Sequence, residues 1–152
     1  MKKCILAVPV VFLLLAAEEG KKDANKELKK FAGTCVIVSG EINGNKVPDD
    51  WVNKTPQTFK GNSVARKFKD KTVKATFQVD PSKDPKWFDG KGEVEEKEVH
   101  LRGIYKFEDG QLTICVARCI GKELKRPKEF STEGGTKKTF LILIVLKKAK
   151  AK

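Results

Sequence analysis

The segment from Gly103 to Val116 constrains the fold more than any other part of the chain. It reads GIYKFEDGQLTICV, which is two largely apolar runs separated by Asp109-Gly110. Asp-Gly is typical of a two-residue type I′ turn, because both central residues of that turn need a positive φ. Apolar side chains stand at every second position from Leu112 onward, as in a strand with one buried face. The segment therefore predicts an antiparallel β-hairpin.

The same pattern of short strands and tight turns recurs along most of the chain. Residues alternate clearly between apolar and polar from Thr72 to Val79, and Asn43-Gly44 and Gly61-Asn62 provide turns, the second of type II′. The run from Phe140 to Leu146 is apolar on both faces, which suits a strand that closes a barrel. The sequence predicts an all-β fold, an antiparallel up-and-down barrel of about eight strands. A two-sheet sandwich is the alternative.

Two finer assignments follow from local composition. Trp87-Phe88 opens a strand, and Asp89-Gly90 is interpreted as a turn or bulge within it. Glu129-Phe130-Ser131 is predicted to form a short strand, with Gly134-Gly135 as the turn that follows.

The first twenty residues have the organisation of a secretory signal peptide. Met1-Lys2-Lys3 is basic, residues 4–17 are apolar, and Glu18-Glu19-Gly20 begins a polar stretch. The apolar run is shorter than the roughly 20 residues of a membrane span, and Pro9 interrupts it. An uncleaved anchor helix is the alternative. We expect an exported protein, periplasmic or extracellular, with no transmembrane span after signal removal.

The remaining chain divides simply. Residues 21–30 (KKDANKELKK) form a charged linker or a short helix, residues 31–148 form the barrel domain, and residues 149–152 are a basic tail. No internal repeat and no Pro- or Ser-rich linker divides the barrel region, so one domain is expected.

The chain is strongly basic, with 32 Lys and Arg against 20 Asp and Glu, a formal net charge of +12. Such a charge suits a polyanion, but the basic residues are scattered and interleaved with acids, and Glu93–Glu98 is locally acidic. Basic residues are most frequent from Arg66 to Lys74 and in the tail from Lys147 to Lys152. We interpret this as a solvated basic surface. Nucleic acid is not an expected partner, whereas an anionic envelope polymer or an acidic protein is an alternative one.

Cysteines Cys35, Cys115 and Cys119 remain after signal removal, an odd number for an oxidising compartment. On one extended strand the Cα atoms of Cys115 and Cys119 would lie about 13 Å apart, too far for a disulfide. We predict a disulfide between Cys35 and Cys119, with Cys115 as a small core hydrophobe. The absence of any disulfide is the alternative.

No pattern of catalytic residues emerges. His100 is the single histidine and sits in a strand-like segment without an evident partner nucleophile. The chain lacks a phosphate-cradling glycine-rich loop and the close C-x₂-C spacing of a zinc site. We assign no catalytic residue, no metal ligand and no cofactor, and expect a non-enzymatic protein.

Three segments together resemble a known family. They are Phe31–Ser39 followed by Glu41–Gly44, the hairpin segment Leu101–Cys115, and Arg126–Phe130 with the apolar strand after it. In order and spacing they resemble a family of small, uncharacterised secreted domains of planctomycete bacteria described as lipocalin-like. The resemblance implies an eight-stranded lipocalin-like barrel and export, and no particular activity. Members usually carry Trp where this chain has Cys35, so one large aromatic plug of the barrel is missing here.

A small barrel of this kind can hold one compact apolar or amphipathic ligand in its mouth. Four aromatic residues and two arginines are candidates for lining that mouth, the arginines by fixing a carboxylate or phosphate. They are Trp51, Trp87, Tyr105, Phe107, Arg102 and Arg126. The alternative is that the aromatic residues simply fill the interior. A second functional hypothesis is a cell-envelope structural or interaction protein that uses its basic surface.

Overall fold

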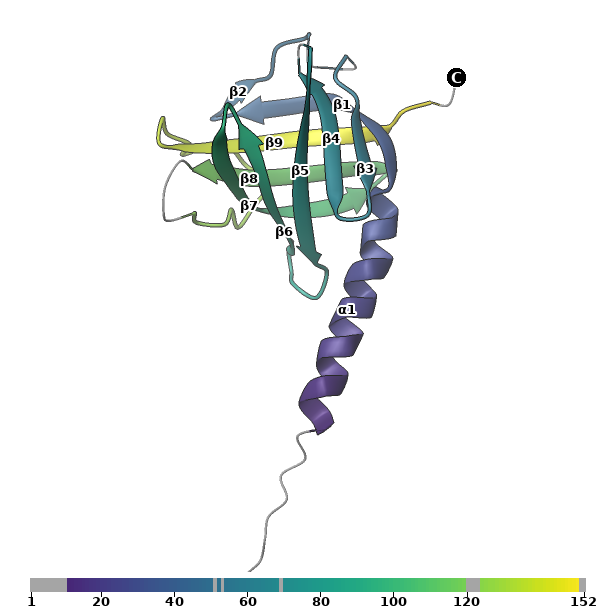
Figure 1. Cartoon of the computed structure of the whole chain (residues 1–152). Helices are drawn as coiled ribbons and strands as arrows, with labels where there is room; N and C mark the ends of the chain where they lie inside the picture. The colour runs from purple at the N-terminus through teal and green to yellow at the C-terminus, as the bar shows by residue number, and fades with distance from the viewer. Residues whose placement is uncertain (1–10, 51, 53, 69, 120–123, 151–152) are drawn as a thin grey trace, which may run out of the picture.

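The computed structural model describes residues 11–50, 52, 54–68, 70–119 and 124–150 (Figure 1). In these residues one helix precedes the strands, α1 (Val11–Phe31). The strands are β1 (Gly33–Ile42), β2 (Asn45–Lys46), β3 (Gln57–Lys60), β4 (Ser63–Phe68), β5 (Lys71–Asp80), β6 (Lys86–Val94), β7 (Lys97–Glu108), β8 (Gln111–Cys119) and β9 (Thr139–Lys148).

The strands form a closed antiparallel barrel. The order of the strands around the barrel is β1, β3, β4, β5, β6, β7, β8, β9. Strand β9 pairs with both β8 and β1 and so closes the barrel. Strand β2 forms a short pairing with the end of β1. The predicted eight-stranded, up-and-down antiparallel barrel is confirmed, and the sandwich alternative is wrong. The apolar run Phe140–Leu146 lies in the closing strand, as its pattern predicted.

The turn residues behave as their chemistry predicts. Asp109 has a φ of 51° and Gly110 a φ of 71°, the double positive φ of a type I′ turn. Gly61 has a φ of 57°, which suits the first central position of a type II′ turn. The β6–β7 turn was not predicted, because its positive-φ residues are Glu95 and Glu96, a residue type that rarely occupies this conformation.

Asp89-Gly90 is a correction to the sequence-based assignment. These residues are neither a turn nor a bulge but the middle of β6, where the register is continuous and Gly90 is paired with Phe77 on β5 and Leu101 on β7. Gly90 faces the barrel interior, and a Cβ there would lie 3.3 Å from the Leu101 side chain. Glycine at this position reflects close packing rather than a change of chain direction.

The second correction concerns residues 129–131, which form no strand; residues 129 and 130 are bends. They belong to a loop that packs on the outer face of β7 and β8. Ser131 accepts a hydrogen bond from the Cys115 thiol at 3.5 Å, and beneath this loop Ile104 and Ala117 are almost fully buried. The segment is held by the sheet surface and is not part of the sheet.

The predicted disulfide between Cys35 and Cys119 is also wrong. Cys35 pairs with Lys148 and Cys119 with Thr139, the two ends of β9. At about 3.3 Å per residue, the length of that strand separates them by about 30 Å. Cys35 carries a free thiol, and Cys115 is a free, fully buried core residue as expected.

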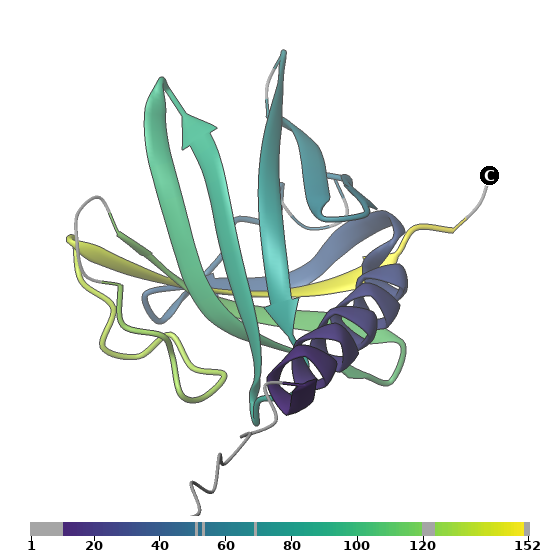
Figure 2. The same cartoon turned by 60° about the horizontal axis from the view of Figure 1, so that its bottom comes forward.

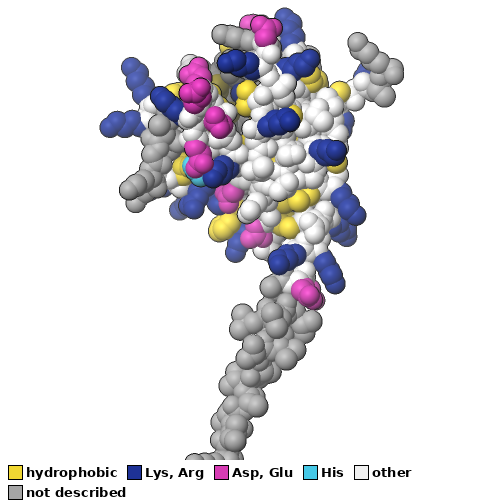
Figure 3. Space-filling model, in the orientation of Figure 1, with side chains coloured by type: hydrophobic (Ala, Val, Ile, Leu, Met, Phe, Trp, Pro, Cys, Tyr) yellow, Lys and Arg dark blue, Asp and Glu magenta, His cyan; other side chains and the backbone are white. Residues whose placement is uncertain are grey.

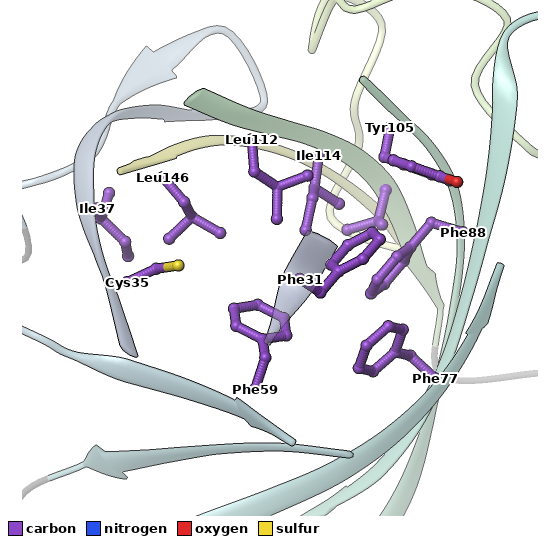
Figure 4. Packing of buried hydrophobic residues seen from close by; sticks show 11 residues of the cluster. Phe31, Cys35, Ile37, Phe59, Phe77, Phe88, Tyr105, Leu112, Ile114 and Leu146 are labelled. Carbon is purple, nitrogen blue, oxygen red and sulfur yellow. The ribbon is translucent and has the colours of Figure 1, made fainter. Parts of the chain in front are cut away.

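The core at one end of the barrel is an aromatic cluster around Phe31, the last residue of α1. Phe31 is fully buried, and Figure 4 shows its ring among those of Phe59, Phe77 and Phe88. Its ring centroid lies 5.2 Å from that of Phe77 and 5.1 Å from that of Tyr105. The helix thus supplies the ring at the centre of this end of the barrel.

Helix α1 therefore closes one end of the barrel and projects away from it (Figures 1 and 2). Residues 21–30 are helical rather than a linker, and Leu28 packs against the aromatic cluster. The last turn of α1 belongs to the barrel domain. Of the residues that the structure describes, no helix combines the length and apolar character that crossing a bilayer requires.

A cation fixes the C-terminal end of α1. The Nζ of Lys148, near the end of β9, donates to the backbone carbonyl of Phe31 at 2.7 Å and also to that of Ala32. The last carbonyls of a helix lack intrahelical partners, and the helix dipole favours a positive charge there. Lys148 thus joins the end of the last barrel strand to the end of the helix.

A buried carboxylate provides the second attachment of α1. Glu27 is 5 % exposed, and its carboxylate accepts a hydrogen bond from the Tyr105 hydroxyl at 3.2 Å. It forms ion pairs of 2.7 Å with both Lys30 and Lys86. Burial would raise the pKa of Glu27, but the two ammonium groups outweigh it and hold that pKa below its usual value.

Replacing Glu27 by glutamine is expected to lower the free energy of unfolding by about 1 to 2 kcal/mol near pH 7, a moderate loss because both lysine partners are partly solvated. The folded-state pKa is depressed, so the ionised carboxylate stabilises the fold above its unfolded-state pKa of about 4.3. The stability difference between wild type and variant should shrink as the pH falls from about 5 towards 3. Urea unfolding across this range measures it. A difference that stays constant with pH would contradict the assignment.

Candidate functional site

The half of the barrel away from α1 contains a cavity. Its volume is about 360 Å³, within the range of small-molecule pockets, roughly 300 to 1,000 Å³. Apolar side chains that point inward from all eight barrel strands form most of its wall, among them Val64, Ala75, Val116 and Ile142. The aromatic cluster forms its floor, because Phe59 and Phe88 contribute to both.

The cavity exists because small residues occupy inward positions at this end. Ala75 on β5 is paired with Gly92 on β6, and a Cβ on Gly92 would lie 3.0 Å from that of Ala75. Further along the same two strands, towards α1, the inward residues are Phe77 and Phe88. Large rings therefore fill one end of the barrel and small side chains leave space at the other.

Two arginines line this apolar cavity. Arg66 on β4 stands opposite Gln57 on β3, and Arg118 on β8 stands opposite Leu101 on β7, all four lining the cavity. The Nε of Arg118 is buried and finds no hydrogen-bond partner among the residues that the structure describes. Burial, with a contribution from the nearby charge of Arg118, lowers the pKa of Arg66.

Two of the predicted ligand-binding residues lie inside the barrel but away from the cavity. Tyr105 is 1 % exposed, and its hydroxyl is bonded to Glu27. The Phe107 ring centroid is 5.0 Å from that of Phe31. Both residues pack at the α1 end of the barrel. They fill the interior there and do not line the cavity, as the alternative to the ligand-binding prediction stated.

Three other predicted residues lie on the outer surface. Trp87 is 37 % exposed, and the guanidinium of Arg126 stacks 4.2 Å from its ring centroid. Arg126 also donates to the Gly103 carbonyl at 2.6 Å and pairs with Asp89 at 2.8 Å. Arg102 is exposed on the outer face of β7. None of the three predicted residues lines the interior cavity. Their arrangement instead holds the loop that contains Arg126 against β6 and β7.

Trp51, the remaining candidate, lies outside the described residues. His100 is on the exposed outer face of β7, with its Nε2 2.6 Å from the Glu98 carboxylate. Burial raises the pKa of the Cys115 thiol to about 11, so at neutral pH it is protonated and packs as an apolar group.

The sequence interpretation missed Arg66 and Arg118, although a signal for each was present. In β8, Leu112, Ile114 and Val116 are inward, and Arg118 continues that alternation. In β4, Arg66 follows the inward Val64 by two residues. The sequence interpretation placed Arg66 in a basic surface stretch, although the alternation of side chains along a strand puts it on the same face as Val64.

Comparison of the chain with protein-family models, with curated proteins and with solved structures found no match. Membership of the lipocalin-like planctomycete family therefore stays a prediction, and the interior cavity is the basis for a function.

Proposed function

We propose that this protein is a non-enzymatic binding module that holds one small apolar or amphipathic molecule in the cavity of its barrel. The observation that supports the proposal is the cavity itself, about 360 Å³ lined mostly by apolar side chains that come from every barrel strand. A preformed apolar cavity of this size favours binding because the ligand exchanges contact with water for contact with apolar side chains.

The proposal includes export. The order of basic, apolar and polar residues in positions 1–20 supports secretion to the periplasm or beyond. Cleavage near Gly20 would leave Glu27, Leu28 and Phe31 in the mature chain. The residues that close the barrel at the α1 end would therefore be retained.

Binding should depend on ligand length in a defined way. Burial of one CH₂ group contributes about 0.8 kcal/mol, so each added CH₂ should tighten binding by about fourfold until the cavity is full. A homologous series of linear alcohols, titrated by calorimetry, gives both this increment and the length at which it stops.

Replacing Ala75 by leucine should abolish binding of an environment-sensitive apolar fluorophore. Ala75 is one of the small inward residues that leave space for the cavity, so a leucine there would fill the volume that the ligand needs. Thr76→Leu is the matched control, because Thr76 is the next residue of β5 and is exposed on the outer face. Trp87→Ala, also on the outside, should leave binding unchanged.

Fluorescence titration of the three variants, with circular dichroism to confirm folding, distinguishes the outcomes. Equal binding by wild type and Ala75→Leu, or loss of binding on Thr76→Leu alone, would place the ligand outside the barrel and refute the proposal.

The alternative, a cell-envelope role through the basic surface, has weaker support. Figure 3 shows Lys and Arg side chains spread over the visible face, with Asp and Glu among them. Moreover, each of the two most basic segments contributes a residue to the fold itself: Arg66 faces the cavity and Lys148 caps α1. Added salt weakens binding of a polyanion to exposed charges, but it should barely change binding of a neutral apolar probe.

A further inference from the structure

The two cavity arginines come from opposite sides of the barrel. Around the closed sheet, β5, β6 and β7 separate β4 from β8 on one side, and β3, β1 and β9 separate them on the other. Arg66 on β4 and Arg118 on β8 therefore approach the same space from facing walls.

Both arginines lie towards the open end of the cavity. The β3–β4 turn and the β7–β8 turn lie at the α1 end, so β4 and β8 both run from the aromatic cluster towards the open end (Figure 1). Arg66 follows Val64 along β4, and Arg118 follows Val116 along β8. A ligand group bound between them would have the apolar part of the cavity beneath it.

A bound anion would offset the cost of placing two guanidinium groups in one apolar space. Desolvation of each guanidinium costs free energy, and their mutual repulsion adds to it. The buried Nε of Arg118 lacks a hydrogen-bond partner among the described residues, so one donor remains to be satisfied. Among the described residues, Gln57 and the exposed Glu93 also line the cavity.

We infer that the ligand is a single-chain amphiphile with an anionic head group of the carboxylate class. Its head is held by Arg66 and Arg118, and its apolar tail extends towards the aromatic cluster. A planar guanidinium matches a carboxylate with paired N–H donors, which a point charge does not. This inference rests on the proposed function, because it names the chemical class of the molecule in the same cavity.

Calorimetric titration with dodecanoate and with dodecanol tests it, since the two probes share one chain and differ in head charge. We expect the wild-type protein to bind dodecanoate at least about tenfold more tightly than dodecanol, because hydrogen bonds to charged groups are the stronger ones. Arg118→Met, which keeps the length and removes the charge, should reduce this preference to about twofold or less. Acetate alone should not bind measurably, because it lacks the tail.

Arg102→Met is the matched control, an exposed arginine on the outer face of neighbouring β7, and should keep the wild-type preference. Equal affinity for the two probes, or a preference that survives Arg118→Met, would overturn the inference while leaving the proposed function intact. Failure of both probes to bind would refute the proposed function itself. Should Arg118→Met not fold, dodecylammonium on the wild-type protein decides instead: we expect no binding, and binding as tight as dodecanoate would overturn the inference.

Discussion

Replacing Phe31 by alanine should lower the free energy of unfolding by about 3 to 5 kcal/mol, the usual cost of deleting a buried aromatic ring. Phe31 is fully buried and contacts five other aromatic rings, so its removal leaves a cavity lined by groups that cannot easily close it. The same change removes the anchor of α1 at the barrel end. Urea unfolding followed by circular dichroism measures the loss.

Phe140→Ala is the matched control for this prediction. Phe140 is also a phenylalanine of the barrel, but it is 37 % exposed at the open end, so its removal should cost about 1 kcal/mol. Limited proteolysis should in addition cleave α1 faster in the Phe31 variant than in the Phe140 variant. Similar losses of stability for the two variants would show that α1 does not close the barrel as described.

Gly103→Ala should destabilise the protein by about 3 kcal/mol or more, although it adds one methyl group. A Cβ at Gly103 would lie 2.2 Å from the carbonyl oxygen of Cys115 and 2.9 Å from the Cα of Val116. These are backbone atoms of the paired strand β8, so relief requires that β7 and β8 separate.

Gly90→Ala provides the comparison, since it adds the same methyl group on the neighbouring strand. Its Cβ would lie 3.3 Å from the side chain of Leu101, which can adjust, and the cost should stay near 1 kcal/mol. Thermal unfolding of both variants distinguishes the two cases. A Gly103 variant as stable as the Gly90 variant would contradict the close approach of β7 and β8.

The strands were predictable from sequence because their signals are local. Asp109-Gly110 determines a hairpin by its own conformational preference, and the run Phe140–Leu146, with apolar residues on both faces, suits the strand that closes the barrel. Such signals do not depend on what lies across the barrel.

The helical plug was not predictable in the same way. In the segment KKDANKELKK and the residue after it, Leu28 and Phe31 pack against the barrel, but most of the residues around them are charged, so the local pattern does not show that they close a barrel. The anchoring carboxylate, Glu27, resembles any surface glutamate until Lys86 and Tyr105 are brought beside it.

The candidate site depended on strand register, and there the sequence misled. Because Asp89-Gly90 was interpreted as a turn or bulge, the face of the sheet on which Trp87 lies stayed undetermined, and a shift of one residue moves every side chain to the other face. Trp87 is on the outside, with Arg126 stacked on it, whereas the residues that line the cavity include arginines with no distinguishing local motif.

The position of β9 has a consequence for how the protein is made. It is the last barrel strand along the chain, yet it pairs with β1 and carries the lysine that caps α1. Ribosomal synthesis delivers it after every other barrel strand, so neither the circle of strands nor the helix cap can be completed while the chain is still emerging. Until then the unpaired edges of β1 and β8 are exposed and able to pair with other chains.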